Sequence, residues 1–236
     1  MVAALITGAS RGIGAATARR FAEAGFDLLL LARPSDDFAA LLPELRELGV
    51  RVESTHLDLT DPTAVEPGVA ELCSRGLVPT VVINNAGAAW TGPLIEMPLD
   101  RWQWMLQLNV TSVFQVCRAV VPLLRQQGGG QILNVSSHAS RNAFPDWGAY
   151  CTCKAALASF SRCLAEEERS HGIRVGTLTL GSVNTPLWDS DTVNSCFDRR
   201  AMLSAEQAAA ALLFLAQQPS IQSVEDLTLM PAAGVF

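Results

Sequence analysis

The sequence predicts an α/β fold, in which a doubly wound parallel sheet of about seven strands carries helices on both faces. Three observations support this prediction. Short apolar segments alternate with longer segments of helical periodicity along all 236 residues. Segment 27–32, DLLLLA, is apolar almost throughout, which is typical of a parallel strand covered on both faces. No shift in composition divides the chain, so we expect a single domain over residues 1–236.

The expected strands are short apolar runs, and one of them, RVESTHLDL, alternates polar and apolar positions. They cover residues 2–6, 27–32, 51–59, 80–84, 131–137, 174–180 and 226–230. The expected helices cover residues 13–25, 38–49, 63–76, 99–127, 149–172 and 204–218. Gly25 and Gly172 end two of these helices. Ser204 and Gln207 predict a capping box at the start of the last one.

Composition and charge narrow the possible partners. The net charge is −6 with a pI of about 5.1, and no basic run occurs, so we expect no nucleic-acid partner. The first residues contain neither a basic segment nor a long apolar one, which predicts a cytoplasmic protein without a membrane span. The six cysteines are scattered without a C-x-x-C pair, so we expect reduced thiols and no metal site.

A glycine-rich turn, TGASRGIG, lies between the first expected strand and the first expected helix. Glycines there allow the backbone to approach a pyrophosphate, which the helix N-terminus attracts. No Lys-Ser/Thr follows the last glycine, so the turn is not a P-loop. A turn without a ligand is the alternative, but a position after an N-terminal strand favours a dinucleotide. The expected binding residues of this turn are Gly8, Ser10, Arg11, Gly12, Ile13 and Gly14.

The only tyrosine and the only lysine, Tyr150 and Lys154, lie four residues apart in an expected helix, while arginine supplies every other fixed positive side chain. Residues at this spacing share one helix face. An ammonium about 4 Å from a phenol stabilises the phenolate by about 4 kcal/mol at an effective dielectric of about 20. We therefore expect Lys154 to lower the pKa of Tyr150 toward neutrality, so that the phenol can protonate a developing alkoxide. The alternative is that both residues survive by chance in a skewed composition.

Five motifs occur in a fixed order along the chain: TGASRGIG (7–14), LDL (57–59), NNAG (84–87), NVSS (134–137) and YCTCK (150–154). Together they resemble the short-chain dehydrogenase/reductase family over nearly the whole chain. The resemblance implies a Rossmann-type fold and hydride transfer between a nicotinamide cofactor and a carbonyl or alcohol. In this family the tyrosine gives the proton, and the lysine also holds the ribose of the nicotinamide.

Two further catalytic residues follow from the resemblance. Ser137 stands where the family keeps a serine that hydrogen-bonds the substrate oxygen, and strand alternation allows only one of Ser136 and Ser137 to face the site. Asn109 matches the asparagine that kinks the long helix and, through a water molecule, links the lysine to solvent. A mid-helix asparagine that bonds only locally is the alternative.

The resemblance also assigns cofactor contacts beyond the glycine turn. Asp58 is expected to bond the adenine amino group, and Asn85, Ala86 and Gly87 to pack beside the adenosine ribose. In LGSVNTP, Val183 is expected to meet the nicotinamide carboxamide through its backbone, and Thr185 also matches the family pattern. Leu180 stands where the family has proline, which leaves this loop less rigid.

The choice of cofactor depends on the end of the second strand. NAD-preferring members have an acidic residue there, whereas this chain has Ala32 followed by Arg33. Arg33 and Arg11 could clamp a 2′-phosphate, so we expect NADP(H). The alternatives are that both are ordinary surface arginines, and that nearby Asp36 and Asp37 favour NAD.

Residues 187–203 are expected to form a short substrate lid. Trp90, His138, Trp147 and Trp188 are candidate lining residues of an apolar pocket, although each could instead be a core or surface residue. A homodimer or homotetramer is expected from the resemblance. Two other functions fit the motifs: a cofactor-binding redox sensor without catalysis, and an epimerase or dehydratase that uses the same tyrosine and lysine.

Overall fold

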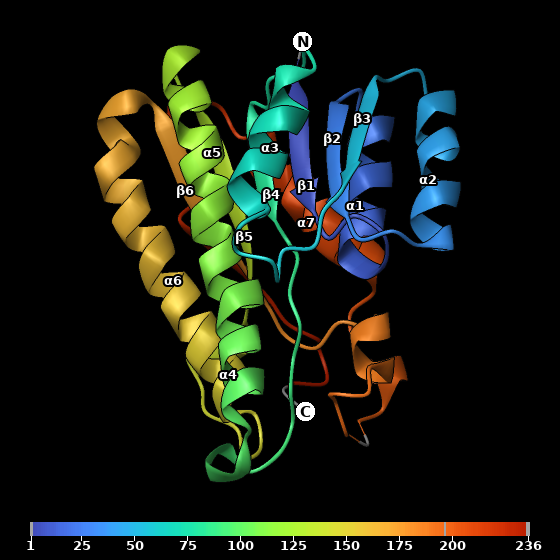
Figure 1. The fold of residues 1–236 in the computed structure, drawn as a ribbon, viewed down its shortest axis with the longest axis vertical. Helices are drawn as coiled ribbons and strands as arrows, with labels where there is room; N and C mark the ends of the chain where they lie inside the picture. The colour runs from blue at the N-terminus through green and yellow to red at the C-terminus, as the bar shows by residue number, and fades with distance from the viewer. Residues whose placement is uncertain (1, 196, 235–236) are drawn as a thin grey trace.

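A computed structural model describes residues 2–195 and 197–234. Its seven strands form one parallel sheet in the order β3-β2-β1-β4-β5-β6-β7 (Figure 1). The strands are β1 (Ala3–Thr7), β2 (Asp27–Ala32), β3 (Val52–His56), β4 (Val81–Asn84), β5 (Gly130–Ser137), β6 (Ile173–Leu180) and β7 (Asp226–Leu229). This confirms the predicted doubly wound sheet.

The α-helices connect the strands as crossovers. They are α1 (Gly12–Glu23), α2 (Asp36–Glu47), α3 (Val65–Ser74), α4 (Leu99–Leu106), α5 (Ser112–Gln126), α6 (Gly148–Glu168) and α7 (Ala205–Ala216). The capping box of α7 is formed, since Ser204 and Gln207 exchange side-chain-to-backbone hydrogen bonds. None of the helices in the described part of the chain is long and apolar enough to cross a membrane.

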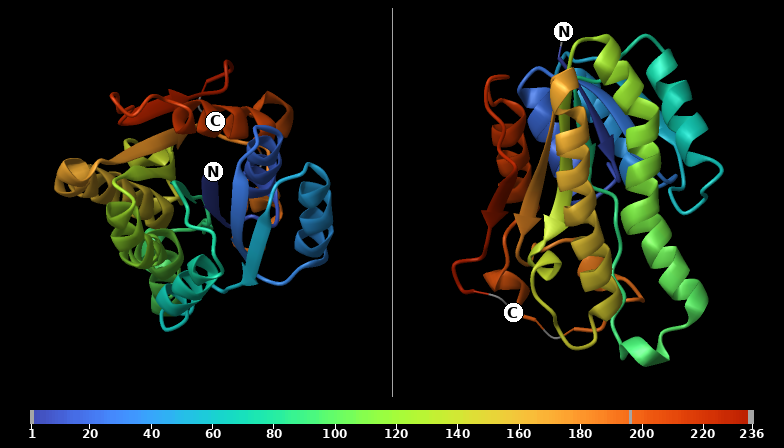
Figure 2. Two further views of the ribbon diagram at one scale, coloured as in Figure 1. Left: turned by 90° about the horizontal axis from the view of Figure 1, so that it is seen from above. Right: turned by 90° about the vertical axis from the view of Figure 1, so that its left-hand side faces the viewer.

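Two apolar layers hold the helices against the sheet, because successive strand residues point to opposite faces. In β2, Leu28 and Leu30 pack in the layer of α1, α2 and α7, whereas Leu29 and Leu31 pack in the layer of α3, α5 and α6. All four leucines are fully buried or nearly so. The right-hand view of Figure 2 shows the two helix layers on opposite sides of the strands.

The segment 99–127, which was predicted as one helix, differs from that prediction in its middle. Between α4 and α5 the chain forms a π-helical turn, Gln107–Thr111, so the path stays helical but widens for one turn. Turns of this kind often occur at functional sites. The buried Asn109 lies in this turn.

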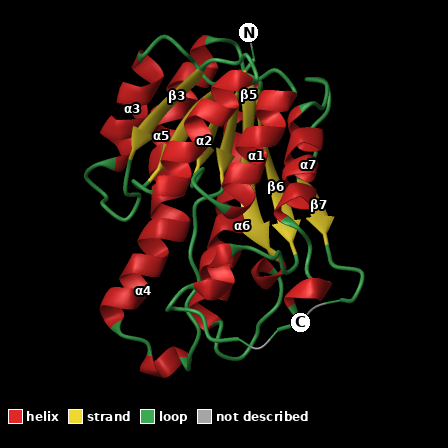
Figure 3. Cartoon of the chain, turned by 90° about the vertical axis from the view of Figure 1, so that its right-hand side faces the viewer, coloured by secondary structure: helices red, strands yellow, loops and turns green. Residues whose placement is uncertain are grey.

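All strands point in one direction, toward the loop-rich end of the molecule (Figure 3). From β1 the chain adds β2 and β3 on one side, and then returns to place β4 on the other side of β1, so the strand order reverses there. In open α/β sheets, ligands bind at such a switch point, outside the carboxyl ends of the strands. The candidate site lies there.

Candidate active site

A cavity of about 790 Å³ opens at the carboxyl ends of the strands. Its walls come from the loops that follow β1, β2, β3, β4, β5 and β6, and from α4, the π-helical turn and α6. It brings together nearly all of the predicted site residues. Those that line it are Gly8, Ser10, Arg11, Gly12, Ile13, Arg33, Asp58, Asn85, Ala86, Gly87, Asn109, Ser137, His138, Trp147, Tyr150, Lys154, Val183, Thr185 and Trp188.

Glycines shape the turn after β1 for two different reasons. Gly8 has a φ of +66°, and a Cβ atom there would lie 2.9 Å from the Cα of Ala86. Gly14 does not line the cavity; a Cβ atom there would lie only 2.1 Å from the carbonyl oxygen of Gly8. Gly14 therefore lets α1 approach the turn closely, which is a packing role behind the predicted binding surface.

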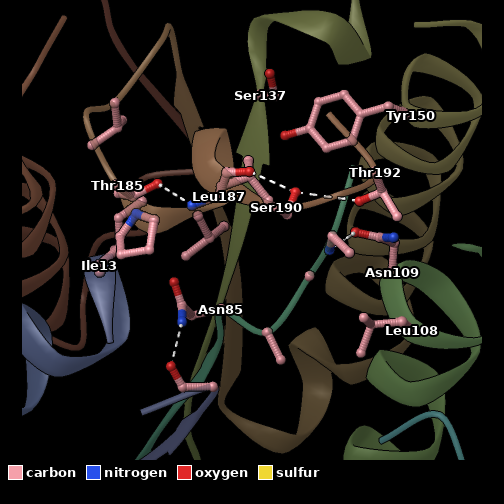
Figure 4. A pocket seen from close by; sticks show the side chains of 18 of the residues that line it. Ile13, Asn85, Leu108, Asn109, Ser137, Tyr150, Thr185, Leu187, Ser190 and Thr192 are labelled. Atoms are coloured by element: carbon pink, nitrogen blue, oxygen red, sulfur yellow. Dashed lines mark hydrogen bonds between the residues drawn. The ribbon is translucent and has the colours of Figure 1, made fainter. Parts of the chain in front are cut away.

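The NNAG segment fastens the end of β4 to this turn. The hydroxyl of Thr7 accepts hydrogen bonds from the backbone N–H groups of Asn85 and Ala86, both at 3.0 Å. In return, the side-chain amide of Asn85 donates to the carbonyl oxygens of Thr7 and Gly8, at 3.0 and 3.3 Å. Figure 4 shows Asn85 at this junction. These bonds fix the glycine turn to the end of β4.

The glycine turn offers positive charge to an anion. No side chain caps the first turn of α1, and no acidic residue lies in that turn. The first N–H groups of the helix, at the positive end of its dipole, are therefore available to an anion in the cavity. Arg11 and Arg33 are exposed on either side. Within the described residues, neither guanidinium forms a hydrogen bond or an ion pair. The turn and these side chains fit a dinucleotide with phosphate groups.

Two hydroxyl groups meet at the other end of the cavity. Tyr150, from α6, and Ser137, at the end of β5, both line this end, and Ser137 acts to lower the pKa of the phenol. The Ser137 Oγ also accepts from the N–H of Ala139 at 3.2 Å, which directs the hydroxyl proton away from the backbone. Figure 4 shows the two side chains next to each other. The buried hydroxyl of Ser136 has no partner in the described structure.

Lys154 lies one helical turn after Tyr150 and is 6% exposed. Its Nζ donates to the carbonyl oxygen of Val135 at 3.0 Å and lies 5.6 Å from the centroid of the Tyr150 ring. The ammonium therefore lies close to both the Tyr150 ring and the backbone of β5, the strand that carries Ser137.

The expected lowering of the tyrosine pKa is wrong for this structure. Burial raises the pKa of Tyr150 to about 12, and the neighbouring Ser137 side chain acts in the opposite direction. Burial also lowers the pKa of Lys154 to about 8. Removal from water favours the neutral form of both groups, and this effect exceeds the attraction that the spacing alone suggested. The phenol keeps its proton at neutral pH.

Asn109 is held by backbone groups on both sides. Its Nδ2 donates to the carbonyl oxygen of Met105 at 2.9 Å, and its Oδ1 accepts from the N–H of Ala88 at 3.2 Å. A Cβ atom on Gly87 would lie 2.8 Å from Asn109 Oδ1 and 3.8 Å from Lys154 Nζ. Gly87 therefore marks the place where the asparagine and the lysine approach each other. The local bond to Met105 fits the alternative interpretation of Asn109, and the contact with Ala88 goes beyond it.

The loop after β6 places Val183 and Thr185 against the cavity. The carbonyl oxygen of Val183 accepts from Nε1 of Trp188 at 2.7 Å, so the indole ties the loop to the segment that follows it. The Thr185 hydroxyl accepts from the N–H of Leu187 at 3.4 Å. Leu180, which replaces the family's proline, pairs with Ser137 and Leu229 in the sheet.

The predicted pocket tryptophans divide into two groups. Trp147 and Trp188 line the cavity, and so does His138. Trp90 is not among the lining residues; a Cβ atom on Gly92 would lie 2.6 Å from its ring, so it packs on its own loop. The sequence analysis missed Trp104, Phe144 and Phe197, which also line the cavity. Phe197 lies inside the predicted lid, and Phe144 lies three residues before Trp147, so these two positions held a usable signal.

The doubly wound sheet and the glycine turn at its switch point define a Rossmann-type protein. The family model for short chain dehydrogenase matches residues 2–194. The chain therefore belongs to the short-chain dehydrogenase/reductase family, a family of oxidoreductases, and this confirms the resemblance. In the described residues, no three His, Cys, Asp or Glu side chains are grouped so that they could hold a metal ion.

Several characterised proteins are similar to this chain. The short-chain reductase protein NovJ of Streptomyces niveus is 32% identical over 92% of this chain and 87% of its own length. The alcohol dehydrogenase of the archaeon Thermococcus sibiricus, solved with 5-hydroxy-NADP, is 30% identical with a TM-score of 0.89, covering 98% of this chain and 97% of its own. Carveol dehydrogenase from Mycobacterium avium, solved with NAD, is 25% identical with a TM-score of 0.88, covering 98% and 96%.

Proposed function

We propose that this protein is an NADP(H)-dependent short-chain reductase that converts a carbonyl to an alcohol, or the reverse. The observation that carries the proposal is the meeting of Ser137 and Tyr150 in one cavity with Lys154 beside them. We assign these three residues and Asn109 as the catalytic residues.

A bound nicotinamide supplies or accepts the hydride. Tyr150 holds the proton that the developing alkoxide needs, since its pKa of about 12 keeps the phenol protonated at neutral pH. This protonation state suits reduction. The Ser137 hydroxyl, whose oxygen already accepts from Ala139, directs its proton toward Tyr150 or toward a substrate oxygen. Lys154 and Asn109 flank Gly87, where they can orient the nicotinamide ribose.

We infer that the dinucleotide lies along the glycine turn and the carboxyl ends of β2 and β4. The residues that would hold it are Gly8, Ser10, Arg11, Gly12, Ile13, Arg33, Asp58, Asn85, Ala86, Gly87, Tyr150, Lys154, Val183 and Thr185. Arg11 and Arg33 favour the 2′-phosphate of NADP(H), because both guanidinium groups are exposed and the described chain offers neither an anionic partner. Relatives solved with NADP-type and NAD cofactors both occur.

We infer one catalytic domain with a substrate lid over residues 187–203, of which Cys196 lies outside the described residues. The lid begins with Leu187 and Trp188, which line the cavity, and returns to the loop after β6, where Leu203 bridges to Val183. A cytoplasmic, homo-oligomeric protein that acts on a small carbonyl or alcohol remains our prediction.

The proposal is tested with a panel of aldehydes and ketones in the presence of NADPH. The wild-type protein should consume NADPH with some members of the panel, and Tyr150→Phe should lose about 10²- to 10⁴-fold in kcat. The same variant should still bind NADPH, measured by fluorescence. Binding without turnover by the wild type, across the whole panel, would favour the redox sensor. Turnover of a carbohydrate substrate with no net change in NADPH would favour the epimerase or dehydratase.

Cofactor choice is tested separately, by comparing kcat/KM with NADPH and NADH. We expect NADPH to be preferred, and Arg33→Asp to erode that preference by about tenfold or more through loss of a charged phosphate contact. Arg101→Asp, an exposed arginine that does not line the cavity, is the matched control. An equal or higher kcat/KM with NADH in the wild type rejects the NADP(H) assignment.

A further inference from the structure

A row of aromatic rings extends from the phenol to the lid. The centroids of Tyr150 and Trp147 are 5.7 Å apart, those of Trp147 and Trp188 also 5.7 Å, and those of Trp188 and Phe197 5.6 Å, with edge-to-face geometry at each step. All four side chains are half-buried and line the cavity, so part of each ring faces the open space. Such pairs hold their rings in defined orientations.

The ring of Trp188 offers its carbon surface to a ligand. Its one polar atom, Nε1, is occupied by the carbonyl oxygen of Val183 at 2.7 Å. This bond also fixes the indole between Trp147 and Phe197. The wall beside Tyr150 is therefore both apolar and ordered before a substrate arrives.

Among the described residues, no free cation lines the substrate end of the cavity. The cationic lining residues of the described chain are Lys154, whose amine is on the Val135 carbonyl, and Arg11 and Arg33 at the dinucleotide end. Arg199, in the lid, is not a lining residue, and its guanidinium binds Asn184, Asp189 and the carbonyl oxygen of Thr185. His138, the remaining basic side chain, has its Nε2 against the Asn142 amide at 2.8 Å.

An exposed carboxylate, Asp191, lines the same wall. A carboxylate, sulfonate or phosphate on the substrate would meet this negative charge and no unengaged guanidinium or ammonium. Burial of an unpaired charge is costly, so this end of the site disfavours anions.

The hydroxyl groups of Ser190 and Thr192 form hydrogen bonds within the lid. Ser190 Oγ donates to the carbonyl oxygen of Leu187 at 2.8 Å, so the 3.3 Å contact with Thr192 places Thr192 as the donor to Ser190 (Figure 4). Both hydroxyl protons are then engaged. Ser137 and Tyr150 present their hydroxyl groups beside this wall, where a carbonyl oxygen of the substrate can bind.

We propose that the substrate is an uncharged aromatic aldehyde or ketone whose ring packs against Trp147 and Trp188 while its carbonyl meets Ser137 and Tyr150. This inference rests on the proposed function and names the substrate class of the same site. The aromatic wall supplies the binding surface, and the described lining at this end offers no free cation to an anionic analogue.

The test uses four aldehydes with the full-length protein and NADPH: benzaldehyde, 2-naphthaldehyde, cyclohexanecarbaldehyde and 4-carboxybenzaldehyde. We expect kcat/KM for benzaldehyde and 2-naphthaldehyde to exceed that for cyclohexanecarbaldehyde by about fivefold or more, the effect of an added aromatic pair. We expect 4-carboxybenzaldehyde to be at least about 100-fold poorer than benzaldehyde, because its charge is unpaired.

Two lid variants separate ring stacking from a general loss of structure. Trp188→Ala should reduce the preference for benzaldehyde over cyclohexanecarbaldehyde toward unity, and Trp188→Phe should retain most of it. Phe214→Ala removes an exposed ring from α7 outside the cavity and should leave the preference unchanged. Tryptophan fluorescence of Tyr150→Phe with NADP⁺, titrated with 2-naphthaldehyde, measures binding without turnover.

The outcomes distinguish the two proposals. Equal or better use of cyclohexanecarbaldehyde or 4-carboxybenzaldehyde overturns the aromatic substrate while the reductase assignment stands. No reduction of any aldehyde, with saturable quenching by 2-naphthaldehyde, overturns the reductase and leaves the aromatic site in place. Neither reduction nor quenching overturns both.

Discussion

The Nζ of Lys154 and the backbone carbonyl oxygen of Val135 are 3.0 Å apart. Val135 and Ser137 lie two residues apart on β5. The strand that positions the Ser137 hydroxyl therefore also supplies the carbonyl oxygen that binds the ammonium. The buried lysine is thus anchored to the backbone at one point, and this anchor does not remove the cost of its burial, because its pKa is lowered to about 8.

Lys154 should make stability depend on pH. Its ordinary pKa is 10.5 and its folded pKa is about 8, so between these values the unfolded chain holds a proton that the folded chain has lost. Stability therefore rises with pH across this window. Relative to Lys154→Met, the wild-type free energy of unfolding should gain on the order of 2 kcal/mol between pH 7.5 and 10. Urea unfolding at a series of pH values measures this difference; a difference that is flat or falls with pH contradicts it.

Ser137 and Ser136 should behave differently although they are neighbours. Ser137→Ala removes a donor beside Tyr150, and kcat should fall by about 10²- to 10³-fold, as for loss of one donor to a developing oxyanion. Ser136→Ala removes a buried hydroxyl without a partner in the described structure, so stability should be unchanged or slightly higher. Steady-state kinetics and thermal unfolding of both variants test the pair. A larger loss of kcat in Ser136→Ala would reverse the assignment.

The hydroxyl of Thr7 should be needed for the shape of the glycine turn. Thr7→Val keeps the side-chain shape but leaves the N–H groups of Asn85 and Ala86 without their acceptor, at a cost of about 1–3 kcal/mol each. Thr7→Ser retains the oxygen and should lose much less. Chemical denaturation compares the two variants, and equal stability would show that the hydroxyl is dispensable.

Gly14→Ala should disrupt the turn without adding a group to the cavity surface. Its Cβ atom would lie 2.1 Å from the Gly8 carbonyl oxygen, so α1 must move away from the turn. We expect a loss of about 3 kcal/mol or more in stability, at the upper end of the cost of overpacking, and weaker binding of NADPH. Gly25→Ala, at a φ of +81° with nothing within 4 Å, should cost only about 1 kcal/mol. Thermal unfolding and a NADPH titration check both expectations.

The sheet and much of the candidate site could be predicted because their signals are local. Apolar runs, the glycine turn and the spacing of Tyr150 and Lys154 are all visible in the sequence, and the structure brings the two residues into one cavity. The tyrosine pKa could not be predicted from that spacing, because it depends on how far the fold removes both groups from water. The packing of Trp90 on its own loop, away from the cavity, likewise could not be predicted, because it depends on how that loop folds.

The π-helical turn between α4 and α5 has a consequence for how this segment can vary. A regular α-helix rotates by about 100° per residue, and a π-helical turn holds about one residue more. The apolar stripe of α5, which includes Val113, Val116 and Val120 in the core, is therefore out of step with the stripe of α4, from which Trp104 reaches the cavity. The two halves of this continuous helical segment therefore pack against different surroundings, the cavity for α4 and the core for α5. α4 can therefore direct Trp104 into the cavity while α5 keeps its valines in the core.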